Sequence, residues 1–220
     1  MSEGTDRIDR MHLLLLSLGV GAVPDFIANH INRAPHEVRI GYLNDAARPY
    51  VGASFVAAER QQLTELGYPL TDITVTDFDD DKAFSAALDG IDALYVAGGN
   101  TFALLEALRR YGADQVLTDK VKAGLPYIGA SAGSIVTGPS IEPVSLMDDP
   151  AHAPELTSRI GLGLIETTVI PHSDGQLPPY PPTIIAQIKQ TYEGEYPLTF
   201  INDDQALLID DASPQLISSP

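Results

Sequence analysis

One serine in the middle of the chain has the surroundings of a nucleophile. Ser131 lies in the pentapeptide Gly129-Ala130-Ser131-Ala132-Gly133, which ends an apolar run. A G-x-S-x-G pattern is typical of a sharp turn between a strand and a helix, because glycine tolerates the strained backbone and the close packing there. Such a turn exposes the serine hydroxyl above a sheet. The pentapeptide favours a serine hydrolase, although the same glycines could serve a tight turn without chemistry.

A serine hydroxyl needs a general base within hydrogen-bond reach. His172 follows the β-branched segment 167–170 after a single proline, Pro171, so we expect its ring at the same sheet edge as Ser131. It is therefore the predicted general base and, later in the reaction, the general acid. His152, in a long loop, is the alternative. The remaining histidines lie in or near the first elements of the chain and are His12, His30 and His36.

A carboxylate should bind the far nitrogen of the histidine and orient its ring. The candidates that follow His172 are Asp174, Asp203 and Asp204. The last two lie in a turn after an apolar segment, which is a typical position for a site residue but also for a solvated turn. The residues alone leave the choice between Asp203 and Asp204 open.

Acyl transfer also needs backbone N–H groups that bind the developing oxyanion. The N–H of Ala132 comes with the serine turn. The second turn of interest, Gly98-Gly99-Asn100, also follows an apolar segment, and Gly99 would allow a substrate to approach the backbone closely. We therefore predict an oxyanion hole formed by Gly99 and Ala132. The alternative is that this turn merely caps the next helix.

Strand-like and helix-like segments alternate along the chain. This alternation predicts an α/β domain with a mostly parallel sheet and helices on both faces. The sites of such sheets lie at the carboxyl ends of the strands, where both turns are expected. The late segments 198–201 and 206–209 are expected to form a strand pair, and 138–159 a long loop. The other expected strands are 13–17, 38–43, 73–75, 93–96, a strand beginning at 127–128, and 167–170, and the expected helices are 24–32, 51–66, 81–88, 101–111, 114–123 and 183–191.

Composition limits the classes of function. The net charge of −17 disfavours binding to nucleic-acid phosphates and to anionic membranes. The absence of cysteine excludes disulfides, thiolate metal sites and a cysteine nucleophile. We expect a cytoplasmic protein, monomeric or homodimeric, with one domain over residues 11–220 and a flexible leader over residues 1–10.

Together these motifs resemble the peptidase E family of serine peptidases, which are relatives of cyanophycinase. The likeness covers most of the chain from Met11 onward, and the first matching segment, which Leu104-Leu105 follows, is quite specific. The matching segments are Ala97-Gly98-Gly99-Asn100-Thr101-Phe102, Gly129-Ala130-Ser131-Ala132-Gly133 and Ile170-Pro171-His172.

The resemblance implies a three-layer sandwich, flavodoxin-like or class I glutamine amidotransferase-like. It implies a nucleophile at Ser131, a base at His172 and an acid in a late turn, for which Asp203 matches better than Asp204. It also implies substrate contacts near the first matching segment and in the loop after the serine. The residues assigned to these substrate contacts are Gly98, Asn100 and Asp148.

The family's aspartyl dipeptidases need a cation to bind the substrate carboxylate. After His172 the chain contains no arginine and only one lysine, Lys189, which leaves Arg159 and Arg48 as candidate cations. We therefore expect a serine peptidase that acts on short peptides without a metal or organic cofactor, and with an unassigned side-chain preference. Two alternatives remain. One is an α/β-hydrolase-type esterase with Asp148 or Asp149 as its acid, and the other is a catalytically idle binding protein of the same fold.

Overall fold

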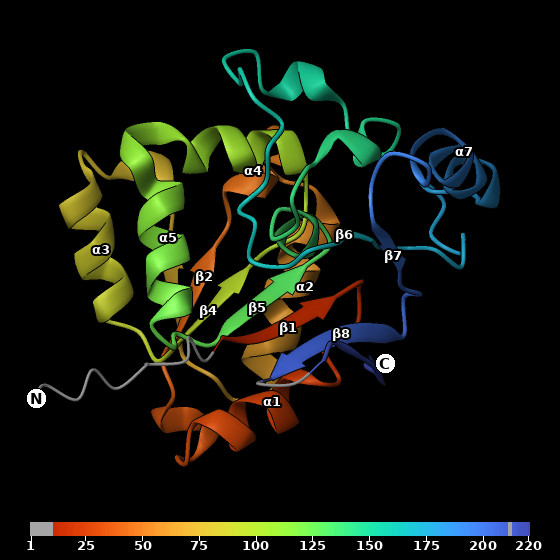
Figure 1. Ribbon diagram of the computed structural model, residues 1–220. Helices are drawn as coiled ribbons and strands as arrows, with labels where there is room; N and C mark the ends of the chain where they lie inside the picture. The colour runs from red at the N-terminus through yellow and green to blue at the C-terminus, as the bar shows by residue number, and fades with distance from the viewer. Residues whose placement is uncertain (1–10, 211–212) are drawn as a thin grey trace, which may run out of the picture.

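Short apolar segments form a seven-stranded central sheet in the computed structural model, which describes residues 11–210 and 213–220 (Figure 1). The expected leader over residues 1–10 lies outside the described residues. The order of the strands is β3-β2-β4-β5-β1-β8-β9. Their bounds are β1 (His12–Leu16), β2 (Ile40–Leu43), β3 (Leu70–Ile73), β4 (Ala93–Val96), β5 (Tyr127–Ala130), β8 (Gln205–Asp210) and β9 (Gln215–Ser218).

The first five strands of the sheet run parallel, and β8 and β9 extend it antiparallel on the β1 side. A separate pair of parallel strands consists of β6 (Thr168–Ile170) and β7 (Leu198–Phe200). This confirms the expected α/β class with a mostly parallel sheet. The registers place Leu16 beside both Ala130 and Ala206, so the carboxyl ends of β1 and β5 and the start of β8 lie next to one another.

Helices cover both faces of the sheet, which explains the continuous apolar run of β1 (Figure 1). Leu13 and Leu15 pack in the core shared with α3, α4 and α5, whereas Leu14 and Leu16 pack in the core shared with α1 and α2. All four leucines are 0% exposed. The helices are α1 (Val23–His30), α2 (Ser54–Glu65), α3 (Asp81–Asp89), α4 (Thr101–Leu108), α5 (Ala113–Lys122), α6 (Ala132–Ile135) and α7 (Pro182–Tyr192).

The expected late strand pair is wrong. Strand β7 pairs with β6, and β8 pairs with β1, so the turn between them carries the chain from the small sheet to the main one. Strand β5 pairs with only one edge of β1, so the other edge can accept a second strand. The apolar β8 pairs with that edge. Strand β9 was not anticipated because its residues are mostly exposed and lack a buried face.

Smaller differences occur at the ends of elements. The third strand spans 70–73 instead of 73–75, because Val75 reaches the core from a 3₁₀ turn. Helix α4 ends at Leu108, and a 3₁₀ turn with Tyr111 at φ 39° follows. The segment 138–159 is irregular as expected, but it packs against the protein through buried Ile141, Val144 and Asp148. Among the described residues, no helix is long and apolar enough to cross a membrane.

Candidate active site

Ser131 occupies a strained turn between β5 and α6. Its backbone has φ 46° and ψ −105°, a conformation that residues other than glycine rarely adopt. A Cβ on Gly129 would lie 2.4 Å from the Gly133 carbonyl oxygen, and one on Gly133 would lie 2.1 Å from the Val96 carbonyl oxygen. Both glycines of the pentapeptide are therefore required so that α6 can pack directly on β4 and β5. The serine is left at the carboxyl end of the sheet.

His172 lies between the serine and a carboxylate. The Ser131 Oγ is 3.1 Å from His172 Nε2, and His172 Nδ1 is 2.6 Å from Asp203 Oδ1. The histidine follows β6 after Pro171, has φ 58° and is 2% exposed. The structure thus brings together the serine, the histidine and one of the two acids selected from the sequence. Asp204 is exposed, and Asp174 accepts a hydrogen bond from the Gln176 backbone.

Ser17 holds the histidine and the acid in place, and the sequence analysis missed it. The backbone N–H of His172 donates to Ser17 Oγ over 2.8 Å, and Ser17 Oγ donates to Asp203 Oδ1 over 2.9 Å. Ser17 is completely buried and directly follows β1. Its position as a polar residue at the carboxyl end of an apolar strand was the available signal.

Electrostatics keep the carboxylate of Asp203 ionised. Partial burial alone would raise its pKa, but the hydrogen bonds from His172 and Ser17 and the charge of His172 outweigh burial and hold the pKa below its usual value. An ionised Asp203 can accept the Nδ1–H of His172 and leave Nε2 facing the serine. This tautomer is the one that a general base requires.

The turn after β4 lies beside the serine. An added Cβ on Gly98 would lie 3.5 Å from the Cβ of Ser131. Gly99 has φ 139°, and a Cβ there would lie 2.3 Å from the carbonyl oxygen of Ala46, so only glycine fits. The N–H groups of Gly99 and Ala132 have no hydrogen-bond partner among residues 11–210 and 213–220. They are therefore available to a negatively charged oxygen.

Glu59 of α2 supports this turn from behind and was also missed. Its Oε1 accepts hydrogen bonds from the Gly98 N–H over 3.1 Å and from the Tyr95 hydroxyl over 2.9 Å. Burial raises the pKa of Glu59 to about 7, despite these two hydrogen bonds. One glutamate on a largely polar helix carries no sequence signal that would separate it from its neighbours.

Two residues expected to contact substrate connect the 138–159 loop to α4. Asn100 is 0% exposed, its Oδ1 accepts from the Ala103 N–H, and its Nδ2 donates to the Asp149 carbonyl. Asp148 is 5% exposed and accepts the Thr101 N–H over 2.8 Å. Burial raises the pKa of Asp148, while the nearby His172 and His152 oppose the rise. The loop is thereby fixed beside the site.

An aromatic ring covers one face of the His172 imidazole. The ring of Tyr180 stacks on His172 with a centroid distance of 4.9 Å and an interplanar angle of 10°. Tyr180 comes from the proline-rich connector before α7, a segment without a pattern that would predict a site residue. His152, the alternative base, is exposed and contacts the ring of Tyr50. The structure shows no hydrogen bond between His152 and Ser131 within the described residues.

Both candidate cations for a substrate carboxylate already have acidic partners. Arg48 pairs with Glu106 over 3.0 Å. Arg159 pairs with Glu142 over 2.7 Å and lies over the ring of Phe102. These glutamates already neutralise both charges, which weakens the attraction of either arginine for an aspartyl side chain.

Comparison with known proteins places this geometry in a family. The family model described as Peptidase family S51 matches residues 14–217. An uncharacterized peptidase of Listeria innocua is 38% identical over 118 residues, which are 54% of this chain and 56% of the relative. Peptidase E of Streptomyces coelicolor is 44% identical over 87 residues, 40% of this chain and 34% of the relative. The matches thus span about half, or less, of the length of these curated relatives.

A solved structure extends the likeness to the whole fold. A Listeria monocytogenes protein, crystallised as a candidate peptidase E, superposes with a TM-score of 0.82 at 27% sequence identity. The superposition covers 95% of this chain and 98% of that one.

Proposed function

This chain belongs to peptidase family S51, and on that premise we propose that it is a serine peptidase that hydrolyses short peptides through an acyl-enzyme on Ser131. The observation that carries the proposal is the continuous row of contacts from Ser131 Oγ through His172 to Asp203. In this proposal the turn after β5 is a nucleophile elbow, and the row is a catalytic triad.

Acylation begins with attack of Ser131 Oγ on the scissile carbonyl carbon. His172 Nε2 takes the hydroxyl proton, and the ionised Asp203 stabilises the resulting imidazolium through Nδ1–H. The carbonyl oxygen becomes an oxyanion that accepts hydrogen bonds from the N–H groups of Gly99 and Ala132. Both groups lack a partner within the part of the chain that the structure describes, so no intramolecular hydrogen bond has to break before they bind the oxyanion.

Breakdown of the tetrahedral intermediate cleaves the C–N bond. His172 gives its proton to the leaving amine, and the acyl group remains bound to Ser131 as an ester. A water molecule then attacks the ester carbonyl and loses its proton to His172. Collapse releases the carboxylic acid and returns the proton to the serine oxygen.

Restricted access supports a short substrate. His172 is 2% exposed, Tyr180 covers one face of its ring, and the 138–159 loop is fixed to α4 beside it. A folded protein chain could not reach Ser131 without moving these groups, whereas a dipeptide or another short peptide is small enough to enter. The pairing of Arg48 and Arg159 with glutamates argues against a preference for aspartyl substrates.

The esterase alternative required an acid that precedes the histidine in the chain. Asp148 is hydrogen-bonded to the Thr101 N–H, and Asp149 accepts from the Ala151 N–H. The contact of His172 with Asp203 instead favours the order Ser, His, Asp and therefore the peptidase.

A fluorophosphonate probe tests the proposal directly. Wild-type protein should be labelled, Ser131→Ala should not, and Ser54→Ala, which changes an exposed serine at the start of α2, should be labelled like the wild type. Equal labelling of wild type and Ser131→Ala would refute the proposal. A folded wild type that neither reacts with the probe nor cleaves a dipeptide library would instead support the idle binding protein.

A further inference from the structure

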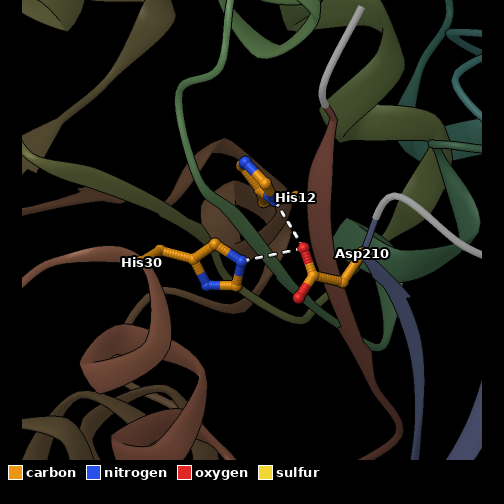
Figure 2. A group of neighbouring side chains, drawn as sticks. All are labelled: His12, His30 and Asp210. Carbon is orange, nitrogen blue, oxygen red and sulfur yellow. Dashed lines mark hydrogen bonds and ion pairs between the residues drawn. The ribbon is translucent and has the colours of Figure 1, made fainter.

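Three side chains from distant parts of the chain meet at the other end of β1 (Figure 2). His12 begins β1, His30 ends α1 and Asp210 ends β8. His12 Nδ1 is 2.6 Å and His30 Nε2 is 3.0 Å from the same oxygen, Asp210 Oδ1. These three atoms all lie within 4.8 Å of one another, and no other such group occurs within residues 11–210 and 213–220.

This cluster is separate from the candidate active site. Ser17, which contacts Asp203, follows the carboxyl end of β1, whereas His12 is at the start of the same strand. A strand of this length separates the two ends by roughly 16 Å. The serine chemistry therefore does not explain why two histidines converge on Asp210.

The hydrogen bonds of His30 leave one contact unsatisfied. His30 Nδ1 is 2.7 Å from the Phe26 carbonyl oxygen, and because a carbonyl only accepts, Nδ1 must carry a proton. In the neutral ring, Nε2 then presents a lone pair to the Asp210 carboxylate, which also presents lone pairs. Two acceptors 3.0 Å apart need a positive charge between them, either a proton or a metal ion.

A metal ion fits all three atoms at once. Protons on His30 Nε2 and His12 Nδ1 would satisfy the two contacts separately, whereas a divalent ion would accept lone pairs from both imidazoles and the carboxylate at once. Ligands of a tetrahedral zinc ion lie roughly 3.3 Å apart, from metal–ligand distances of about 2.0–2.1 Å. The distances to Asp210 Oδ1 are 2.6 and 3.0 Å, which differ from this spacing by only a fraction of an ångström, and His12 Nδ1 and His30 Nε2 lie within 4.8 Å of each other.

We propose that His12 Nδ1, His30 Nε2 and Asp210 Oδ1 form a site for a divalent transition metal, with Zn²⁺ as the preferred ion. Two imidazoles and a carboxylate are typical zinc ligands, and a water molecule would complete the tetrahedron. The carbonyl of Phe26 orients His30 through Nδ1–H, as the outer partners of metal-bound histidines do. The side chain of Asp210 is 37% exposed, which provides a path for the ion.

The ion would act as a structural clip. It would join the start of β1, the end of α1 and the end of β8, and His12 and Asp210 are 198 positions apart in the chain. A ligand that binds only the folded state stabilises it, so metal binding should raise the melting temperature.

Titration of the tag-free, chelator-treated full chain with Co²⁺ tests the site. We expect one equivalent to bind with the intense visible absorption of a tetrahedral ion, and Zn²⁺ to displace it. His12→Gln and His30→Gln should each weaken binding at least ~100-fold, because each removes a ligand of the ion. His36→Gln, which changes an exposed histidine outside the cluster, should bind like the wild type.

Stability provides the second readout. Excess Zn²⁺ should raise the melting temperature of the wild type by roughly 5–10 °C and should leave that of His30→Gln unchanged. Absence of the tetrahedral Co²⁺ spectrum in the folded wild type would refute the proposal, whatever the variants do. Unchanged affinity in folded His12→Gln and His30→Gln, or loss of the spectrum in His172→Ala instead, would also refute it.

Discussion

The antiparallel pair β1–β8 has a histidine–carboxylate contact at each end, and the two ends differ in what shares the carboxylate. At the carboxyl end of β1, Asp203 contacts His172 over 2.6 Å and also accepts from Ser17. At the opposite end, Asp210 contacts His12 over the same 2.6 Å and a second histidine, His30. The first arrangement leaves one imidazole nitrogen for a hydroxyl, whereas the second directs two imidazoles at one point. In the two proposals, the third partner of the carboxylate, and not the histidine–carboxylate pair, distinguishes a catalytic triad from a metal site.

The two ends also differ in backbone strain. Among the described residues, three non-glycine residues have positive φ, and two of them are Ser131 and His172. The residues of the other end lie in a regular helix and regular strands. Strain of this kind persists where the surrounding structure enforces it, and it is concentrated at functional sites. The comparison therefore predicts that substitutions at the two ends will have different, and in one case opposite, effects.

The largest expected effect is that of His172→Ala. It should lower kcat for a cleaved short peptide by ~10⁴-fold or more, because no other base contacts Ser131 within residues 11–210 and 213–220. It should leave the affinity for Zn²⁺ unchanged, because His172 is at the other end of β1. Steady-state kinetics and Co²⁺ titration measure the two quantities. Near-normal activity would identify His152 as the base instead.

The next effect is that of Asp203→Asn, which should lower kcat by roughly 10³–10⁴-fold because an amide stabilises neither the correct tautomer nor the imidazolium. The neighbouring, exposed Asp204 provides the matched control, and Asp204→Asn should retain wild-type kcat. Kinetics on both variants decide between the two acids that the sequence left open. A larger loss in Asp204→Asn would show that the static contact to Asp203 is not the functional one.

Glu59 provides a pH test of the active-site end. Its pKa rises from an ordinary 4.5 to about 7 on folding, so the folded state holds the proton more tightly than the unfolded state. The stability that this proton contributes is present below pH 4.5 and is lost as the pH rises through about 7. The loss is on the order of 3 kcal/mol.

Glu59→Gln should remove that part of the pH dependence, because the amide does not titrate. Urea unfolding of the wild type and of Glu59→Gln at pH 5 and pH 8 measures how the free energy of unfolding changes with pH. Burial also raises the pKa values of Asp45 and Asp148. Both proteins contain these two residues, so their contributions cancel when the variant is compared with the wild type. Glu65→Gln, at the exposed end of the same helix, is the control and should follow the wild type. The prediction would be contradicted if the free energy of unfolding changed equally with pH in Glu59→Gln and in the wild type.

The smallest effect concerns strain. Ser131→Gly should be more stable than Ser131→Ala by about 1 kcal/mol, because glycine relieves the φ 46° backbone that alanine retains. At the other end, metal-free His30→Gly should be less stable than His30→Ala by about 1 kcal/mol, because His30 is helical. Denaturant unfolding of the four variants measures both differences. If the glycine variant were the more stable one at both positions, or the less stable one at both, backbone strain would not distinguish the two ends.

Local patterns predicted much of the fold. The strand Ala93–Val96 has the expected bounds, because four buried apolar residues are followed, after Ala97, by the glycines of a turn. The pairing of 198–201 with 206–209 was wrong, because proximity in the chain does not decide which sheet edge a strand joins. Strand β9 was missed because pairing with β8, and not an apolar face, holds it in the sheet.

The candidate site was predicted to a similar extent. Ser131, His172 and Asp203 could be selected because each lies at a strand end or a turn and has a reactive side chain. Glu59 and Tyr180 could not, because a glutamate on a polar helix and a tyrosine in a connector have ordinary local sequences, and the position of Ser17 after an apolar strand does not show which side chains it contacts. Their roles come from contacts between residues that are distant in the chain, such as the 155 positions between Ser17 and His172.

The sequence by itself determined the chemistry that this protein could carry. It placed a serine between glycines that only a tight turn requires, supplied histidines and carboxylates, and omitted cysteine. The tertiary structure decided which of these groups meet. Asp203 contacts His172, whereas Asp204, the next residue of the same turn, is exposed to solvent. His12 and His30 contact the same oxygen of Asp210. The contact with His12 forms because β8 runs antiparallel to β1 and pairs Asp210 with His12.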